Sequence, residues 1–306
     1  MSQVTVLLRL FVDNLLPVLL MAAAGYVLSR WKRIDPHTLS NTVFYVLSPC
    51  LIFTLLTGSP LDGGEIIRMM SLAAVGLSLL AALAWAGGWF LRLPRRILAA
   101  VSMMVMLPNA ASMGLSVNLF AFGEEAVTHA SLYYVMTAIL LYTLGVVIAS
   151  LGKASLRESV RALLAVPAVY AAAAGFLFQT MSWRLPLPLA RPVTLLGNAA
   201  IPVMLVLLGV QFQRADWRFP RRALGLAVGL RLVVSPAMTL LLGSLLGLPP
   251  LALRAGTLES AMPIAIATTI LATQYDVEPS FVTSAVFIST LLSPLSLTPL
   301  LAILGA

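Results

Sequence analysis

The sequence predicts an all-α membrane protein with ten transmembrane helices, arranged as two inverted five-helix repeats whose fourth and ninth helices are broken by proline. Three observations predict this fold. Of the 306 residues, 60% are hydrophobic and only 10% are charged, at a mean hydropathy of +1.00, whereas about a quarter of a soluble domain is charged. Basic residues gather in alternate connections, and prolines recur at a nearly constant offset.

Apolar runs of membrane-spanning length define the ten spans. The first five are 6–29, 37–57, 66–91, 96–122 and 130–150, and the second five are 165–181, 189–212, 223–247, 252–274 and 279–304. The charged connection 153–161 fits a short surface helix and a solvated loop equally well. No stretch has the composition of a soluble domain. The first run is not expected to be a cleavable signal peptide, because Arg9 is followed by an apolar stretch of about twenty residues with no small-residue cleavage pattern before Arg30.

Charge asymmetry predicts the orientation. The connections after spans one, three, five and seven carry Arg30, Lys32, Arg33, Arg92, Arg95, Arg96, Lys153, Arg157, Arg161, Arg214, Arg218, Arg221 and Arg222, whereas the opposite side carries Arg9, Arg68, Arg184, Arg191 and Arg254. By the positive-inside rule the first set is cytoplasmic, so both termini lie outside. Five spans per half then invert the second half relative to the first, as in many secondary transporters. The net charge of +8 is therefore a topology signal and indicates no nucleic-acid partner.

The prolines indicate an internal duplication. Pro17 and Pro167, Pro49 and Pro202, and Pro108 and Pro263 are separated by 150, 153 and 155 residues. A nearly constant offset is typical of a repeated unit. The third pair places a proline inside span four and another inside span nine.

Span nine carries the strongest candidate for a site. Its apolar run contains Glu259 and, four residues later, Pro263. Proline removes a backbone donor and clashes with the carbonyl four residues back, so the helix should break beside the carboxylate. Such a break persists in a membrane only when it is buried in protein or lines a wet cavity, and an intramembrane Glu beside it is a candidate site. The alternative is a kinked packing helix whose Glu259 is protonated or paired.

Span four carries the corresponding break, in which Pro108 and Gly114 flank Asn109 and Ser112. Two breaks in corresponding spans predict one shared site at mid-membrane. The expected substrate contacts are Pro108, Asn109, Ala110, Ser112, Pro263 and Ile264, and the expected cation contacts are Glu259, Asn109 and Met262. Half-helix N-termini carry partial positive charge and suit a carboxylate, and Glu259 suits H⁺ or Na⁺.

The remaining polar residues form no motif of an enzyme or a metal centre. Arg231, inside span eight, is expected to reach the cytoplasmic surface, and the alternative is a buried, paired guanidinium. His37 and His129 are expected in connections without partners, and Cys50 as a buried hydrophobe. No cofactor is predicted, Na⁺ apart, and no motif for intramembrane hydrolysis occurs.

Four segments, 34–53, 198–209, 231–236 and 259–299, resemble the auxin efflux carrier family, which includes the PIN-formed auxin carriers and carriers assigned to malonate. The resemblance covers nearly the whole chain. It implies a scaffold domain of 6–57 and 165–212, a transport domain of 66–150 and 223–304, and a crossing of spans four and nine at Pro108 and Pro263. The long cytoplasmic loop of the plant carriers is absent from this sequence, which leaves their regulation and their substrate open here.

The run from Glu259 to Met262 is also similar to the Glu-Thr-Gly-Met run of bile acid:sodium symporters, where the Glu helps to bind sodium. Pro263 stands where those symporters have a Gln that also helps, so H⁺ and Na⁺ both remain open. The expected function is a cation-coupled carrier of a small organic anion such as a carboxylate, in the cell (inner) membrane, with a homodimer through the scaffold domain. The alternative is a membrane sensor that binds a ligand without transporting it.

Overall fold

The computed structural model describes residues 3–32, 34–58, 62–150, 164–211 and 220–306, and within these ranges the chain is helical and has no β-strand. Seven helices are long and apolar enough to cross a membrane: Thr5–Trp31, Pro36–Gly58, Gly63–Phe90, Ala110–Ala149, Leu187–Val210, Arg221–Leu245 and Pro279–Leu304. The chain is therefore a multi-pass membrane protein. The connection 153–161, for which a surface helix and a loop were equally open, lies outside the described residues.

The other expected spans contain helices too short for this count. Span six contains α10 (Pro167–Thr180), which has only 14 residues. Span four begins with α6 (Arg95–Met106), which ends at the break, and span nine is divided into α14 (Pro250–Ser260) and α15 (Ala267–Gln274). The long run Ala110–Ala149 contains a break of its own, because Gly123 in α7 has φ 81° and ψ −174°. Proline and this left-handed glycine interrupt apolar runs that are continuous in the sequence.

The first half begins with α1 (Gln3–Leu10), η1 (Phe11–Leu15) and α2 (Leu16–Trp31), followed by α3 (Pro36–Thr42), η2 (Val43–Leu47), α4 (Ser48–Gly58) and α5 (Gly63–Phe90). After α6 come η3 (Ala110–Gly114), α7 (Leu115–Leu140), η4 (Leu141–Gly145) and α8 (Val146–Ala149). Asp35 caps α3 by accepting from the amides of His37 and Thr38. The Thr38 hydroxyl also donates to this carboxylate, and these hydrogen bonds lower the pKa of Asp35 below its ordinary value.

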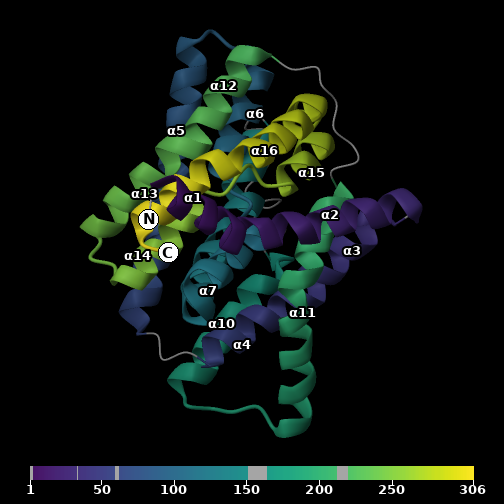
Figure 1. The fold of residues 1–306 in the computed structure, drawn as a ribbon, viewed down its shortest axis with the longest axis vertical. Coiled ribbons are helices and arrows are strands. Elements are labelled where there is room, and N and C mark those ends of the chain that lie inside the picture. The colour runs from purple at the N-terminus through teal and green to yellow at the C-terminus, as the bar shows by residue number, and fades with distance from the viewer. Residues whose placement is uncertain (1–2, 33, 59–61, 151–163, 212–219) are drawn as a thin grey trace.

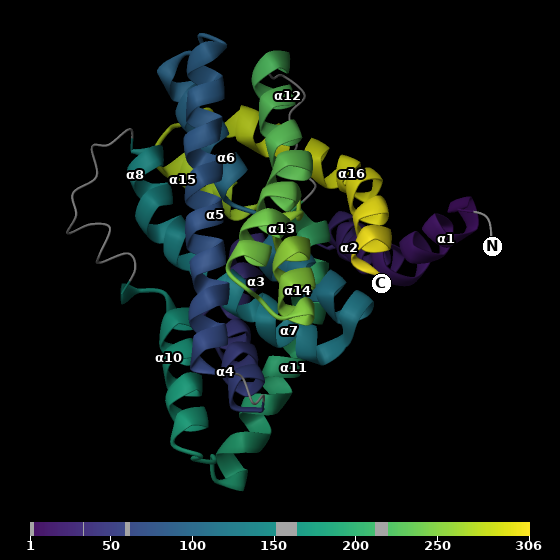
Figure 2. The same cartoon turned by 90° about the vertical axis from the view of Figure 1, so that its left-hand side faces the viewer.

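The second half contains α10, α11 (Leu187–Gln211), α12 (Arg221–Gly229), η6 (Leu230–Val234), α13 (Ser235–Leu245), α14, α15 and α16 (Pro279–Leu304). Helices α2, α4, α10 and α11 pack on one another, and α5, α6, α7, α12, α13 and α14 form a second set (Figure 1). Helix α7 contacts α4 and α10 of the first set, and α1 packs against α16 near the two chain ends (Figure 2).

Helices α2 and α11 approach each other closely enough for backbone contact. A Cβ added at Gly25 would overlap the carbonyl of Val206, and one at Gly209 would overlap the carbonyl of Ala22. Glycine at both positions permits this approach, as small residues do in other membrane helix pairs. Helix α11 of this pair contributes Met204 and Leu207 to the wall of the cavity described below.

Candidate functional site

The first break lies between α6 and η3. Helix α6 ends at Met106, and Leu107 is extended, with φ −106° and ψ 96°. Pro108 has no N–H with which to continue the helix. The helical path resumes at Ala110, after Asn109. The interruption therefore falls in span four at the proline that the sequence indicated.

The second break lies between α14 and α15. Helix α14 ends at Ser260, one residue after Glu259, and α15 begins at Ala267. Pro263 lies in the middle of the intervening segment. The chain therefore leaves the helical path directly beside the carboxylate, as expected from the spacing of Glu259 and Pro263.

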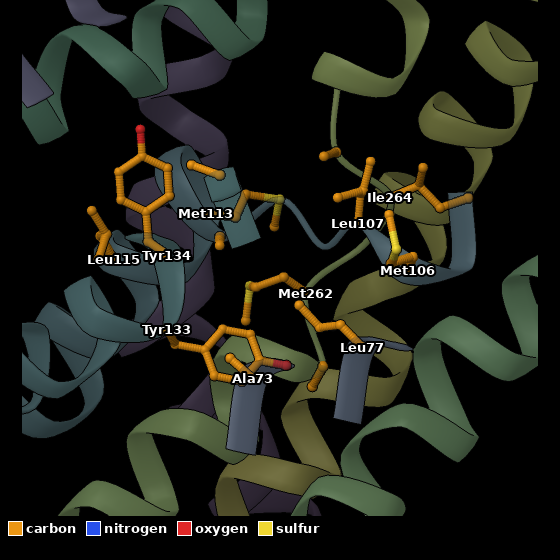
Figure 3. Close-up of a cluster of buried hydrophobic side chains, with 14 of the residues drawn as sticks. Ala73, Leu77, Met106, Leu107, Met113, Leu115, Tyr133, Tyr134, Met262 and Ile264 are labelled. Atoms are coloured by element: carbon orange, nitrogen blue, oxygen red, sulfur yellow. The ribbon is translucent and has the colours of Figure 1, made fainter. Parts of the chain in front are cut away.

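The two breaks pair with each other by backbone hydrogen bonds. The amide of Asn109 donates to the carbonyl of Pro263 at 2.7 Å, and the amide of Ala265 donates to the carbonyl of Leu107 at 2.9 Å. Pro108 and Ile264 face each other as an isolated antiparallel bridge. Figure 3 shows the buried side chains around this junction, among them Leu107 and Ile264. The two broken spans thus cross at their prolines.

A cavity of about 340 Å³ lies on one side of this crossing. Its wall is formed by residues of α3, η2 and α11, by both broken segments, and by Tyr134, Thr137 and Tyr142. The aromatic side chains Phe44 and Tyr45 also line it. Aromatic, hydroxyl and amide side chains therefore surround a space of the size that small-molecule sites usually have.

The predicted substrate residues divide into two groups. Pro108, Asn109, Ala110 and Ser112 line the cavity, whereas Pro263 and Ile264 are not part of its wall. Ile264 is fully buried and its amide donates to the hydroxyl of Ser289 at 3.2 Å. The following residues Ala265, Ile266 and Ala267 line the cavity in their place. The second break therefore reaches the cavity a few residues later than expected.

Asn109 holds an unused donor at the edge of the cavity. Its Oδ1 accepts a hydrogen bond from the Ser112 hydroxyl at 2.7 Å, which fixes the orientation of the amide. Its Nδ2 is buried and has no partner in the structure. A buried donor without a partner is uncommon and costly, so this amide is suited to bind an acceptor that enters the cavity.

Glu259 is fully buried behind the crossing, as is Met262, and neither lines the cavity. Glu259 Oε1 accepts from Asn118 Nδ2 at 3.2 Å, while its Oε2 and the Oδ1 of Asn118 have no partner. Gly114 lies against the carboxylate, and a Cβ added there would overlap it. Asn118, rather than Asn109, is therefore the hydrogen-bond partner of Glu259.

Sequence reasoning missed Asn118 and misplaced three other residues, His37, His129 and Arg231. Asn118 lies one helical turn after Gly114, and this four-residue spacing from the break was the signal that could have found it. His37 was expected in a connection but lies in α3 and lines the cavity. His129 is not in a connection, because it lies within α7 and is 3% exposed. Arg231 does not reach the surface. It is fully buried and donates to the carbonyls of Val105 and Ser260 and to the Ser235 hydroxyl.

A second cavity, of about 820 Å³, lies between α7 and the pair formed by α4 and α11. Its lining includes Thr54, Glu124, Glu125, Thr128 and Asn198, and no residue of the crossing segments 107–109 and 261–266. Helix α7 therefore lines two separate cavities, this one and the cavity at the crossing.

Comparison with known proteins places the chain in a family. The family model described as "Membrane transport protein" matches residues 10–158 and 151–301. An uncharacterised transporter of Methanothermobacter thermautotrophicus is 26% identical over 293 residues, which cover 93% of this chain and 95% of the relative. An uncharacterised transporter of Methanocaldococcus jannaschii is 25% identical, covering 92% and 94%.

A third relative, from Rhizobium meliloti, is named "Putative malonate transporter". It is 28% identical over 276 residues, which cover 86% of this chain and 85% of the relative. These similarities confirm the resemblance to auxin efflux carriers and indicate a transporter rather than an enzyme. The chain belongs to the membrane transport protein family.

Proposed function

We propose that this protein is a secondary active carrier that binds a small organic anion at the crossing of its two broken spans. The observation that carries the proposal is the pairing of Asn109 with Pro263 and of Ala265 with Leu107 beside a cavity of about 340 Å³. Irregular backbone at membrane depth is tolerated where it lines such a cavity, and discontinuous helices of this kind form the binding sites of many transporters.

Among the described residues that line the cavity, His37 is the only basic side chain. None of these described residues is Lys, Arg, Asp or Glu. The amide of Ala110 already donates to the carbonyl of Pro108 at 2.8 Å. The helical segments that begin at Ala110 and Ala267 nevertheless carry partial positive charge at their first turns. Together with the free Nδ2 of Asn109 these groups can hold a carboxylate. The name of the Rhizobium relative makes a short dicarboxylate the first substrate to test.

We further propose that Glu259 binds the coupling cation, either H⁺ or Na⁺. Its buried carboxylate has one oxygen without a partner, next to the equally unpartnered Oδ1 of Asn118. A bare charge at mid-membrane is costly. Neutralisation by a cation would therefore lower the cost of moving the site, and this links ion movement to substrate movement.

We propose that ten spans in two five-helix repeats form two domains that move relative to each other. The scaffold domain is 6–57 and 165–212, and the transport domain is 66–150 and 223–304. The separate packing of α2, α4, α10 and α11 supports this division. The two cavities border α7 at different places, and α7 belongs to the proposed transport domain. A rigid shift of that domain against the scaffold would open one cavity and close the other. A homodimer through the scaffold, in the cell (inner) membrane, completes the proposal.

Ten spans with the basic connections inside place both termini on the outer side. A reporter fused at residue 155 should therefore report cytoplasm, and one fused after Ala306 should report the exterior. Reporters that place the two positions on the same side of the membrane would remove the inverted repeat from the proposal.

Counterflow in proteoliposomes tests the proposed function and separates it from a sensor. Vesicles loaded with unlabelled malonate should take up labelled malonate transiently above the external concentration, and empty vesicles should not. The same assay with other mono- and dicarboxylates defines the substrate. A protein that binds a carboxylate yet shows no counterflow with any of them is a sensor.

A further inference from the structure

Each break takes the amide of the residue after the proline away from its helical carbonyl. In a continuous α-helix the amide of residue i donates to the carbonyl of residue i−4. The amide of Asn109 would therefore pair with Val105, but it donates to Pro263 at 2.7 Å. The amide of Ile264 would pair with Ser260, but it donates to the Ser289 hydroxyl at 3.2 Å. In both spans the residue after the proline has left its helical partner.

The carbonyls that lose these amides, those of Val105 and Ser260, both accept hydrogen bonds from one side chain. Arg231 Nη1 donates to the carbonyl of Val105 at 2.6 Å, and Nη2 donates to the carbonyl of Ser260. The hydroxyl of Ser235, one turn later, also donates to Ser260 at 2.8 Å. Arg231 lies in η6, a single π-helical turn, and is fully buried. The planar fork of the guanidinium can reach two acceptors at once, which an ammonium group does less well.

The charge of Arg231 is met by helix ends rather than by a carboxylate. The described residues form two ion pairs, Arg9 with Asp13 and Arg96 with Asp276, and Arg231 takes part in neither. Val105 and Ser260 lie in the last turns of α6 and α14, where carbonyls lack helical partners and the helix dipole is negative. A cation between two such ends is stabilised by both.

We propose that Arg231 is a positioning residue of the transport site. It holds the ends of α6 and α14 so that the segments after them meet at Pro108 and Ile264. Without it, the Val105 carbonyl is left unpaired in the membrane or recovers its helical amide, and the Ser260 carbonyl keeps only the Ser235 hydroxyl as a donor. Recovery by Val105 would take the Asn109 amide away from Pro263. This inference rests on the proposed function, since it assigns Arg231 a part in that same site.

A cysteine pair across the crossing can test the inference without transport. Cys50, the one cysteine of the chain, is replaced by Ala, and Leu107→Cys is combined with Ala265→Cys. The two backbones are joined by a hydrogen bond of 2.9 Å, so their Cα atoms should lie within the roughly 4.4–6.8 Å that a disulfide spans. Disulfide formation is then compared in the parent, Arg231→Met, Arg231→Lys and Arg254→Met. Arg254 is an exposed residue of α14 that lies over the Phe122 ring, and it provides the matched charge-removal control.

Arg231→Met should slow disulfide formation between the paired cysteines, because an unpaired buried carbonyl disfavours the crossing. In the protein without the cysteine pair, the same substitution should raise the KM of anion uptake about tenfold or more. Arg231→Lys should restore both partly, and Arg254→Met should leave both unchanged. A folded Arg231→Met protein with the parental rate of disulfide formation and the parental KM would overturn the inference. If the Met variant does not fold, parental values in the Lys variant overturn it equally. Normal cross-linking in a parent that transports no anion contradicts the proposed function instead.

Discussion

Glu259→Gln is expected to abolish uptake driven by an ion gradient while exchange of substrate across the membrane survives. The amide keeps the shape of the side chain and can still accept from Asn118 Nδ2, and its own N–H₂ can donate to the free Oδ1 of Asn118. The variant should therefore fold. It can no longer bind a coupling cation, and its empty site no longer carries a charge.

The size of the effect follows from that charge. A charge at mid-membrane costs at least about 2.5 kcal/mol, so its removal shifts the population of the empty moving site by about fiftyfold or more. The variant should equilibrate labelled malonate without accumulating it. Proteoliposomes with imposed pH or sodium gradients measure this, with counterflow as the control for folding. Gradient-driven accumulation at the parental level in Glu259→Gln would remove Glu259 from the mechanism and support its alternative role in packing.

Gly114→Ala should impair both gradient-driven uptake and exchange. The added methyl group would overlap the Glu259 carboxylate, so either the side chain or the start of α7 must shift. Overpacking of this kind typically costs about 1–3 kcal/mol, and the displaced Glu259 would lose Asn118 as its partner. Thermal unfolding of the purified protein should show the loss of stability.

Gly225→Ala is the matched control, because a Cβ at that helical position meets no atom within 4 Å. The combination of Gly114→Ala with Glu259→Ala should recover stability, because the smaller side chain leaves room for the methyl group, but not coupled uptake. Equal unfolding temperatures for Gly114→Ala, Gly225→Ala and the parent would show that Glu259 is not held against Gly114.

The two breaks could be predicted from sequence because their cause is local. A proline removes its own N–H wherever it stands, and the positions of Pro108 and Pro263 were sufficient to locate both interruptions. Most helix limits could also be predicted, because the length of an apolar run is likewise a local property of the sequence. Length alone also misleads, because the run that ends in α8 contains the Gly123 break and α10 has only 14 residues.

The partners inside the site could not be predicted, because they depend on tertiary packing. Arg231 was expected to reach water because it lies shortly after the basic connection that precedes span eight. Its actual partners are carbonyls at two breaks elsewhere in the chain. His129 was assigned to a connection because the kink at Gly123 cannot be distinguished from the end of a span. The aromatic wall at Phe44 and Tyr142 comes from elements about a hundred residues apart.

Protection of a cysteine in the cavity by substrate tests most directly whether the crossing binds the transported anion. In the Cys50→Ala background, Ser112→Cys places a single thiol in the cavity wall, and Lys32→Cys places one at an exposed position after α2 as the control. The rate of alkylation by a small water-soluble reagent is measured with and without saturating malonate, or whichever carboxylate gives counterflow. The anion should slow alkylation at 112 about tenfold or more if it occupies the cavity nearly all the time, and leave the rate at 32 unchanged. A transported anion that leaves the rate at 112 unchanged would contradict binding at the crossing.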